Sequence, residues 1–189
     1  MFGNLVNNVQ LKQLIDSKVV EIAPFNEKLL SLVHYTLHPL IIKERQPDGD
    51  YKTICNLRET PNGYSLKKNS YVIVEIQEQI KLNDEQIVGH FIPSSDLIEL
   101  GLGIVAGKID KKFGTTNNEK GLNQEKIVFG LKNLLPDTDI TIKSNLRLAH
   151  LELFDLRGLA SDKTELSEDE IKTRLRRMLK AMDDGVIYQ

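Results

Sequence analysis

The strongest structural signal in this sequence is a strict two-residue alternation between residues 71 and 80. Val72, Val74 and Ile76 lie on one side of an extended chain, and the residues between them lie on the other. A second run, over residues 146–154, alternates leucines with polar side chains. Because side chains of a strand point to its two faces in turn, both runs predict strands that bury one face. The middle of the chain is therefore expected to form β-sheet.

Turn-forming residues divide the remaining apolar sequence into short pieces. Clusters of Pro, Asp, Asn and Gly occur at residues 46–50, 61–63, 83–84 and 135–137. These residue types favour tight turns, so they delimit about eight to ten short strands. We predict a mainly β body, either a distorted jelly roll or a β-barrel.

Two segments have helical rather than strand periodicity. Val9, Leu11, Leu14 and Ile15 recur at spacings that include three and four residues and predict a short amphipathic helix ending near residue 17. Near the other end, a capping-box pattern precedes an apolar face and predicts a C-terminal helix over 168–182. We therefore divide the chain into a β domain at 1–157 and a helical extension at 158–189.

The basic side chains of this C-terminal helix could belong to a phosphate clamp or to a solvated helix face. They are Arg174, Arg176, Arg177 and Lys180. We favour the solvated face, because acids crowd the first turn and bases the later turns, as the helix dipole alone would favour.

Composition excludes several classes of partner. With 27 acidic and 25 basic residues, the formal net charge is −2, so a nucleic-acid partner is not expected. Cys55 is the only cysteine, which excludes an internal disulfide and indicates a reducing, cytoplasmic location. No apolar run approaches the roughly 20 residues that span a bilayer, and no leader pattern is seen, so we expect a soluble protein without membrane contact.

Common cofactor motifs are also missing. His34, His38 and His90 have no acids at metal-ligand spacing, so no metal site is predicted. The glycines at 101, 103 and 107 do not form a phosphate-binding loop, because no Gly-Lys-Ser/Thr follows and no strand-Gly-x-Gly-x-x-Gly context exists.

Three segments carry motifs in a fixed order. Residues 11–25 read LKQLIDSKVVEIAPF and are followed by HYTL at 34–37. Residues 93–102 read PSSDLIELGL and are followed by AGKIDKKF at 106–113. Residues 127–133 read IVFGLKN and are followed by LRLAHL at 146–151. Together they resemble the family of dCTP deaminases and trimeric dUTPases, over about three quarters of the chain.

The resemblance implies a distorted jelly-roll subunit, a homotrimer, and sites for dCTP, dUTP or dTTP at subunit interfaces, with magnesium accompanying the triphosphate. The nucleotide-binding residues that it implies are Ser94, Ser95, Ala106, Asp110, Arg147 and His150. Plainer alternatives exist for three of these positions. Ser94 could be a simple helix cap, with Asp96 and Glu99 as an acidic capping box. Asp110 could be an ordinary turn residue, and His150, which replaces a glutamine, an ordinary half-buried histidine.

Catalysis is where the sequence departs from the family. The deaminases are implied to use a glutamate base and an arginine, but Gly130 and Glu99 stand at those positions. An aspartate that helps to hold the metal in dUTPases is Thr36 here. Glycine cannot accept a proton, and an acid in place of a cation reverses the local field. Asp96 and Glu99 also place negative charge where phosphates would lie.

We therefore predict a catalytically impaired, nucleotide-binding or regulatory relative in pyrimidine deoxynucleotide metabolism. Asp110 and Glu99 are the weak catalytic candidates that remain. The first alternative is an active dCTP deaminase or dUTP diphosphatase. Further alternatives are a trimeric interaction module without catalysis, and a mixed trimer in which a catalytic paralogue supplies the missing groups.

Overall fold

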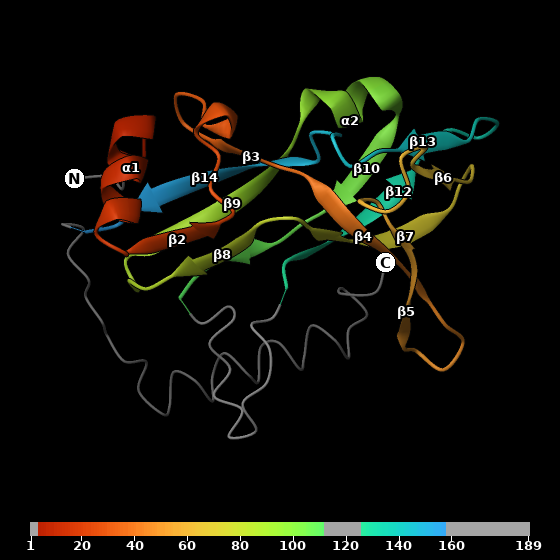
Figure 1. Cartoon of the computed structure of the whole chain (residues 1–189), viewed down its shortest axis with the longest axis horizontal. Helices are drawn as coiled ribbons and strands as arrows, with labels where there is room; N and C mark the ends of the chain where they lie inside the picture. The colour runs from red at the N-terminus through yellow and green to blue at the C-terminus, as the bar shows by residue number, and fades with distance from the viewer. Residues whose placement is uncertain (1–3, 112–125, 158–189) are drawn as a thin grey trace, which may run out of the picture. The chain divides into compact units, whose positions relative to one another are not determined.

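The computed structural model describes residues 4–111 and 126–157, and they form a mainly β structure (Figure 1). Fourteen short strands, two α-helices and one 3-10 helix are found within these residues. The predicted fold class is confirmed. The strands are more numerous than expected because several predicted runs break in two; the run from residue 71 forms β7 (Tyr71–Ile76) and β8 (Gln79–Leu82).

The strands form four separate sheets rather than one closed barrel. The first sheet has the order β1 (Asn4–Leu5), β14 (Ala149–Asp155), β9 (Ile87–Pro93) and β11 (Lys108–Ile109), with β3 (Tyr35–Leu37) also paired to β14. The second has the order β10 (Leu102–Val105), β12 (Val128–Asn133), β7, β4 (Pro39–Arg45) and β5 (Tyr51–Asn56). Two further pairs join β13 (Ile140–Ile142) to β6 (Tyr64–Leu66), and β2 (Val20–Ala23) to β8.

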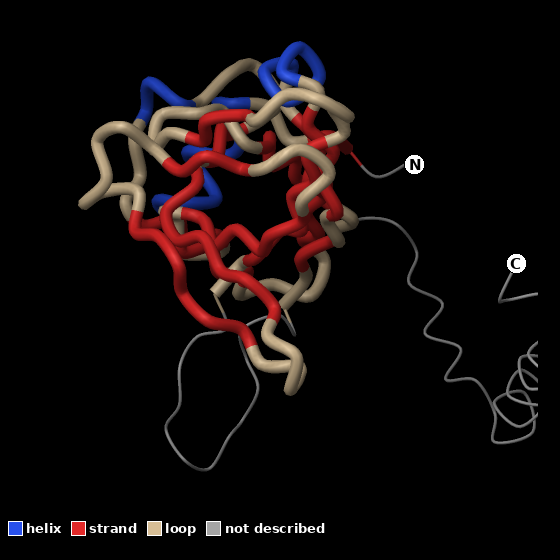
Figure 2. Tube along the Cα trace, turned by 90° about the vertical axis from the view of Figure 1, so that its right-hand side faces the viewer, coloured by secondary structure: helices blue, strands red, loops and turns tan. Residues whose placement is uncertain are grey.

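The two larger sheets pack on each other through the faces that the alternation predicted. Val72 and Val74 of β7 and Leu151 and Leu153 of β14 are at most 3% exposed. The sheets also meet through an edge-to-face pair of aromatic rings, Phe91 of β9 and Phe129 of β12, with centroids 5.0 Å apart. Viewed along the strands, the backbone surrounds this apolar core (Figure 2).

The predicted N-terminal helix is confirmed as α1 (Asn8–Asp16), which begins at a capping box between Asn7 and Gln10. Leu11 and Leu14 bury its apolar face beside β2. None of the described helices is long enough to cross a membrane, since α1 is the longest and has nine residues. The C-terminal helix predicted at 168–182, with its basic side chains, lies outside the described residues, and the domain division remains a prediction.

Strand pairing around β14 determines which distant residues meet. His150 of β14 is paired with Thr36 of β3 on one side and with Ile92 of β9 on the other. The same register places the end of β9, and the helix α2 (Ser95–Leu100) that follows it, beside the beginning of β14. Three of the sequence motifs are therefore neighbours in space although more than 100 residues separate the first from the last.

Candidate functional site

Ser94 links α2 to the beginning of β14. It is the N-cap residue of α2 and is fully buried, but its hydroxyl donates to the backbone carbonyl of Arg147 rather than to the helix. The predicted acidic capping box is wrong, because Asp96 lies inside the first turn and its carboxylate binds another side chain. Ser94 therefore holds the two segments together, while Ser95 and Glu99 are exposed on the helix.

The partner of Asp96 is Arg147. The Arg147 guanidinium donates through Nε to Asp96 Oδ2 at 2.9 Å and through Nη2 to Oδ1. This bidentate contact lowers the pKa of the Asp96 carboxyl and raises the pKa of Arg147. Because the Arg147 side chain is 54% exposed, the pair contributes little stability. Its effect is to fix the direction of the guanidinium.

His150 lies three residues further along and packs against a second histidine. Its Nδ1 is 3.3 Å from Thr36 Oγ1, and its ring centroid is 4.1 Å from that of His34. Burial, the neighbouring His34 and then Arg147 lower the pKa of His150 to about 4, against a smaller opposing effect of Asp96. The ring is therefore neutral at pH 7.

The pKa of His150 predicts a loss of stability in acid. Between pH 6.5 and about 4 the unfolded chain binds a proton at His150 that the folded chain does not, so the free energy of unfolding falls as the pH falls. The contribution is on the order of 1 kcal/mol, since the partly open ring is screened by solvent. His150→Gln should remove it, as measured by urea unfolding at pH 7 and pH 4.5. An equal pH slope in the variant would contradict the assignment.

A third histidine, His38, has an acid partner that the sequence pattern did not reveal. Glu78 is 4% exposed, and its Oε2 accepts from the His38 backbone N–H at 3.1 Å. Its Oε1 lies 3.2 Å from His38 Nδ1. Forty residues separate the two, so spacing along the chain could not have paired them. The contact fixes the His38 ring at the end of β3.

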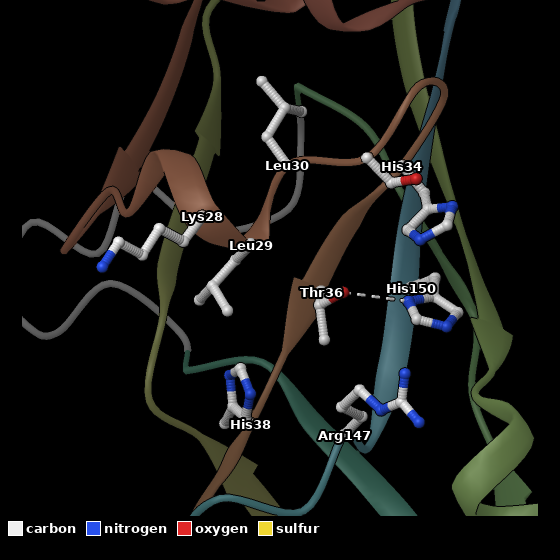
Figure 3. Close-up of a pocket in the computed structure, with 9 residues that line it drawn as sticks. Lys28, Leu29, Leu30, His34, Thr36, His38, Arg147 and His150 are labelled. Carbon is white, nitrogen blue, oxygen red and sulfur yellow. Dashed lines mark hydrogen bonds between the residues drawn. The ribbon is translucent and has the colours of Figure 1, made fainter.

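These side chains surround a cavity of about 550 Å³ (Figure 3). The residues that line it are Lys28, Leu29, Leu30, Ser31, His34, Thr36, His38, Arg147 and His150. In Figure 3 His34, His150 and Arg147 follow one another along one side of the cavity, whereas the Lys28 side chain extends away from them. Of the predicted nucleotide-binding residues, Arg147 and His150 line this cavity directly and Ser94 supports it.

Ala106 and Asp110 are not brought to this cavity. Ala106 is exposed between β10 and β11, and Asp110 follows β11 directly. Since β9 separates β11 from β14 in the sheet, β11 lies at a different edge from the histidines. Asp110 is 3.7 Å from Lys108 Nζ through its Oδ2. Within one chain, the predicted site residues therefore form two separate groups.

Comparison with known proteins identifies the fold. The crystal structure of 2'-deoxycytidine 5'-triphosphate deaminase from Agrobacterium tumefaciens is similar, with a TM-score of 0.57, 12% identity, and coverage of 82% of this chain and 49% of that chain. The chain has a dCTP deaminase-like fold. It spans about half the length of that deaminase. No protein-family model and no curated protein matches the chain.

On this dCTP deaminase-like fold, the ring of Tyr71 lies over Gly130. It lies in the middle of β12, between Val105 of β10 and Ile73 of β7. A Cβ atom at this position would be 2.1 Å from the Tyr71 hydroxyl oxygen. The tyrosine ring therefore occupies the space into which a glutamate side chain at position 130 would extend.

The residues of the cavity do not suit a magnesium ion. Mg²⁺ prefers carboxylate oxygens, and none of the nine described residues that line the cavity is acidic. The hydroxyl of Thr36 is directed to His150. Elsewhere in residues 4–111 and 126–157, no group of three or more His, Cys, Asp or Glu is arranged to hold a metal ion.

Proposed function

We propose that this chain binds deoxynucleoside triphosphates on a dCTP deaminase-like scaffold without deaminating them. The observation that carries the proposal is a cavity of about 550 Å³ that Arg147 and His150 line, on a fold found in a dCTP deaminase. That volume is within the range of small-molecule sites, roughly 300–1,000 Å³. The chain would act as a nucleotide-binding or regulatory protein in pyrimidine deoxynucleotide metabolism.

Loss of catalysis is the second part of the proposal. The position at which the sequence resemblance places the base holds Gly130, and Tyr71 covers it. The position of the arginine holds Glu99, an exposed acid on α2. Neither group can activate water against a cytosine ring as a glutamate and arginine pair would.

We further propose a homotrimer, in which residues 106–110 of one copy approach the cavity of the next. Ala106 and Asp110 lie away from the cavity within one chain, and a neighbouring copy would supply them. The expected molar mass in solution is about three times 21.5 kDa. Light scattering coupled to gel filtration measures it, and a monomer at micromolar concentration would contradict this assembly.

The test of function is a thermal-shift screen with dCTP, dUTP and dTTP, each with and without magnesium. A ligand that binds the native state must raise the unfolding midpoint. We expect a rise with at least one nucleotide, together with release of ammonia or pyrophosphate far below about 1 per second. Enzyme-like turnover that Glu99→Gln abolishes would instead establish the active-enzyme alternative. No rise with any nucleotide would favour the trimeric interaction module.

A further inference from the structure

Two histidine rings pack against each other in the cavity, and one of them, His150, lies next to Arg147. His34 comes from the turn before β3 and His150 from β14, and their ring centroids are 4.1 Å apart. Figure 3 shows both rings on the same side of the cavity as Arg147. Two imidazolium ions at this distance, next to a guanidinium, would repel strongly. Repulsion therefore disfavours a positive charge on both rings at once.

The lining of the cavity favours an anion. It contains one arginine, one lysine, three histidines, a serine and a threonine, and no described acidic residue. The two carboxylates that touch this lining are already engaged, Asp96 by Arg147 and Glu78 by His38. An arginine has five N–H donors, and Asp96 takes two of them, which leaves three for a ligand. Phosphate oxygens are among the acceptors that a guanidinium binds through two hydrogen bonds at once.

We propose that this cavity is a phosphate site in which the His34–His150 pair takes up a proton as the anion binds. The inference rests on the proposed function in one respect, namely that the phosphate belongs to a nucleotide. A bound phosphate supplies the negative charge that offsets repulsion from Arg147, so one ring can become charged. Affinity then rises as the pH falls, by up to about tenfold per pH unit for one proton.

The other charged groups around His150 do not account for proton uptake on phosphate binding. Arg147, which precedes β14, opposes protonation of His150, and Asp96 of α2 favours it. From β3 the neighbour is the neutral Thr36, and across the cavity are Lys28 and the His38–Glu78 pair. Glu152 and His90 come next along β14 and β9 and do not line the cavity. The low pKa of His150, about 4, agrees with a ring that is neutral until an anion enters.

The experiment is histidine NMR on the full chain carrying ¹³C in the imidazole rings, titrated from pH 8 to pH 4.5. The probes are pyrophosphate, dTTP and dCTP, and deoxycytidine as a ligand without phosphate. We expect pyrophosphate and the binding nucleotide to raise the titration midpoint of His150 by at least one pH unit, and deoxycytidine to leave it unchanged. Calorimetry in two buffers of different ionisation heat measures the proton uptake.

His150→Gln is the informative variant, because glutamine preserves a polar group beside Thr36 but cannot be protonated. Between pH 7.5 and 4.5 the affinity of the native chain for pyrophosphate should rise at least about threefold more than that of the variant, as a midpoint raised from about 4 by one unit requires. Since free pyrophosphate titrates identically with both proteins, the ratio of the two affinity changes measures the contribution of the His150 ring. His90→Gln is the matched control, since this exposed histidine packs against Phe154 outside the cavity. His34→Gln serves if the first variant does not fold.

The outcomes separate the two proposals. Nucleotide binding without proton uptake, or with uptake that survives both variants, overturns the proton-linked site and leaves the proposed function. Pyrophosphate binding with uptake but no binding of any nucleotide overturns the proposed function, and the phosphate site is then for a different ligand. Absence of binding by every probe overturns both.

Discussion

Replacing Lys43 and Lys126 together by methionine is expected to lower the free energy of unfolding by about 3–5 kcal/mol. Both ammonium groups bind Glu75 of β7, whose side chain is 2% exposed. Lys43 Nζ lies 2.9 Å from Oε2, and Lys126 Nζ lies 2.5 Å from Oε1. The double variant leaves a buried carboxylate without a cation, which is among the most costly single features in a protein interior.

The pH dependence of the free energy of unfolding shows whether the unpaired Glu75 carboxylate causes this loss of stability. Burial alone would raise the pKa of the Glu75 carboxyl, but its contacts with Lys126 and Lys43 outweigh burial and hold the pKa below its ordinary value. The stabilisation by this cluster is therefore present above about pH 4.5 and is lost as the pH falls through the lower folded pKa. In the double variant burial acts alone, so the carboxyl protonates at higher pH. The difference in the free energy of unfolding between the native chain and the double variant should therefore become smaller in acid.

Urea unfolding at pH 7 and pH 4 measures both effects. Adding Glu75→Gln to the double variant removes the buried charge and should recover most of the loss at pH 7. The control is Lys81→Met, because Lys81 is 3.9 Å from the exposed Glu21 carboxylate and should cost less than about 1 kcal/mol. A loss that the added glutamine does not reduce would show that the lysines act through packing and not through charge.

The faces of the strands could be predicted from the sequence, because alternation is a local property. The pattern places Val72 and Val74 on one face, and both are buried. The partners of polar side chains could not be predicted, because they depend on strand pairing. Glu78 meets His38 across 40 residues, and Thr36 meets His150 across 114.

The local sequence pattern gave a wrong prediction at Asp96. The spacing of Asp96 and Glu99 matches an acidic capping box, yet Asp96 binds Arg147, which the β9–β14 register brings to the helix. The bidentate contact with arginine joins two charge-assisted hydrogen bonds to the attraction between opposite charges, so the distant partner prevails. The resemblance supplies the motif positions, but their division between the cavity and the separate segment around β11 follows only from the order of the strands.

Gly130→Glu is expected to lower the free energy of unfolding by about 1–3 kcal/mol and to leave dCTP deamination undetected. The new Cβ atom would be 2.1 Å from the Tyr71 hydroxyl oxygen and 2.7 Å from Cζ, so the ring must swing away. The ring is the mobile end of a side chain that is 46% exposed, which limits the cost. Under the proposed function no deamination is expected, because Glu99, an acid, remains where the resemblance implies an arginine.

A double-mutant cycle with Tyr71→Ala separates steric conflict from charge. In the Tyr71→Ala background, Gly130→Glu should cost less than about half of its cost beside the tyrosine, because the space is then open. Gly130→Ala in both backgrounds separates the effect of the added Cβ atom from that of the carboxylate. Urea unfolding and ammonia release are measured for all of these variants. A Gly130→Glu variant that is as stable as the native chain with Tyr71 in place would contradict the steric argument. Turnover near 1 per second from the Gly130→Glu substitution alone would mean that one missing base, and not the paired loss with Glu99, is what separates this chain from an active deaminase.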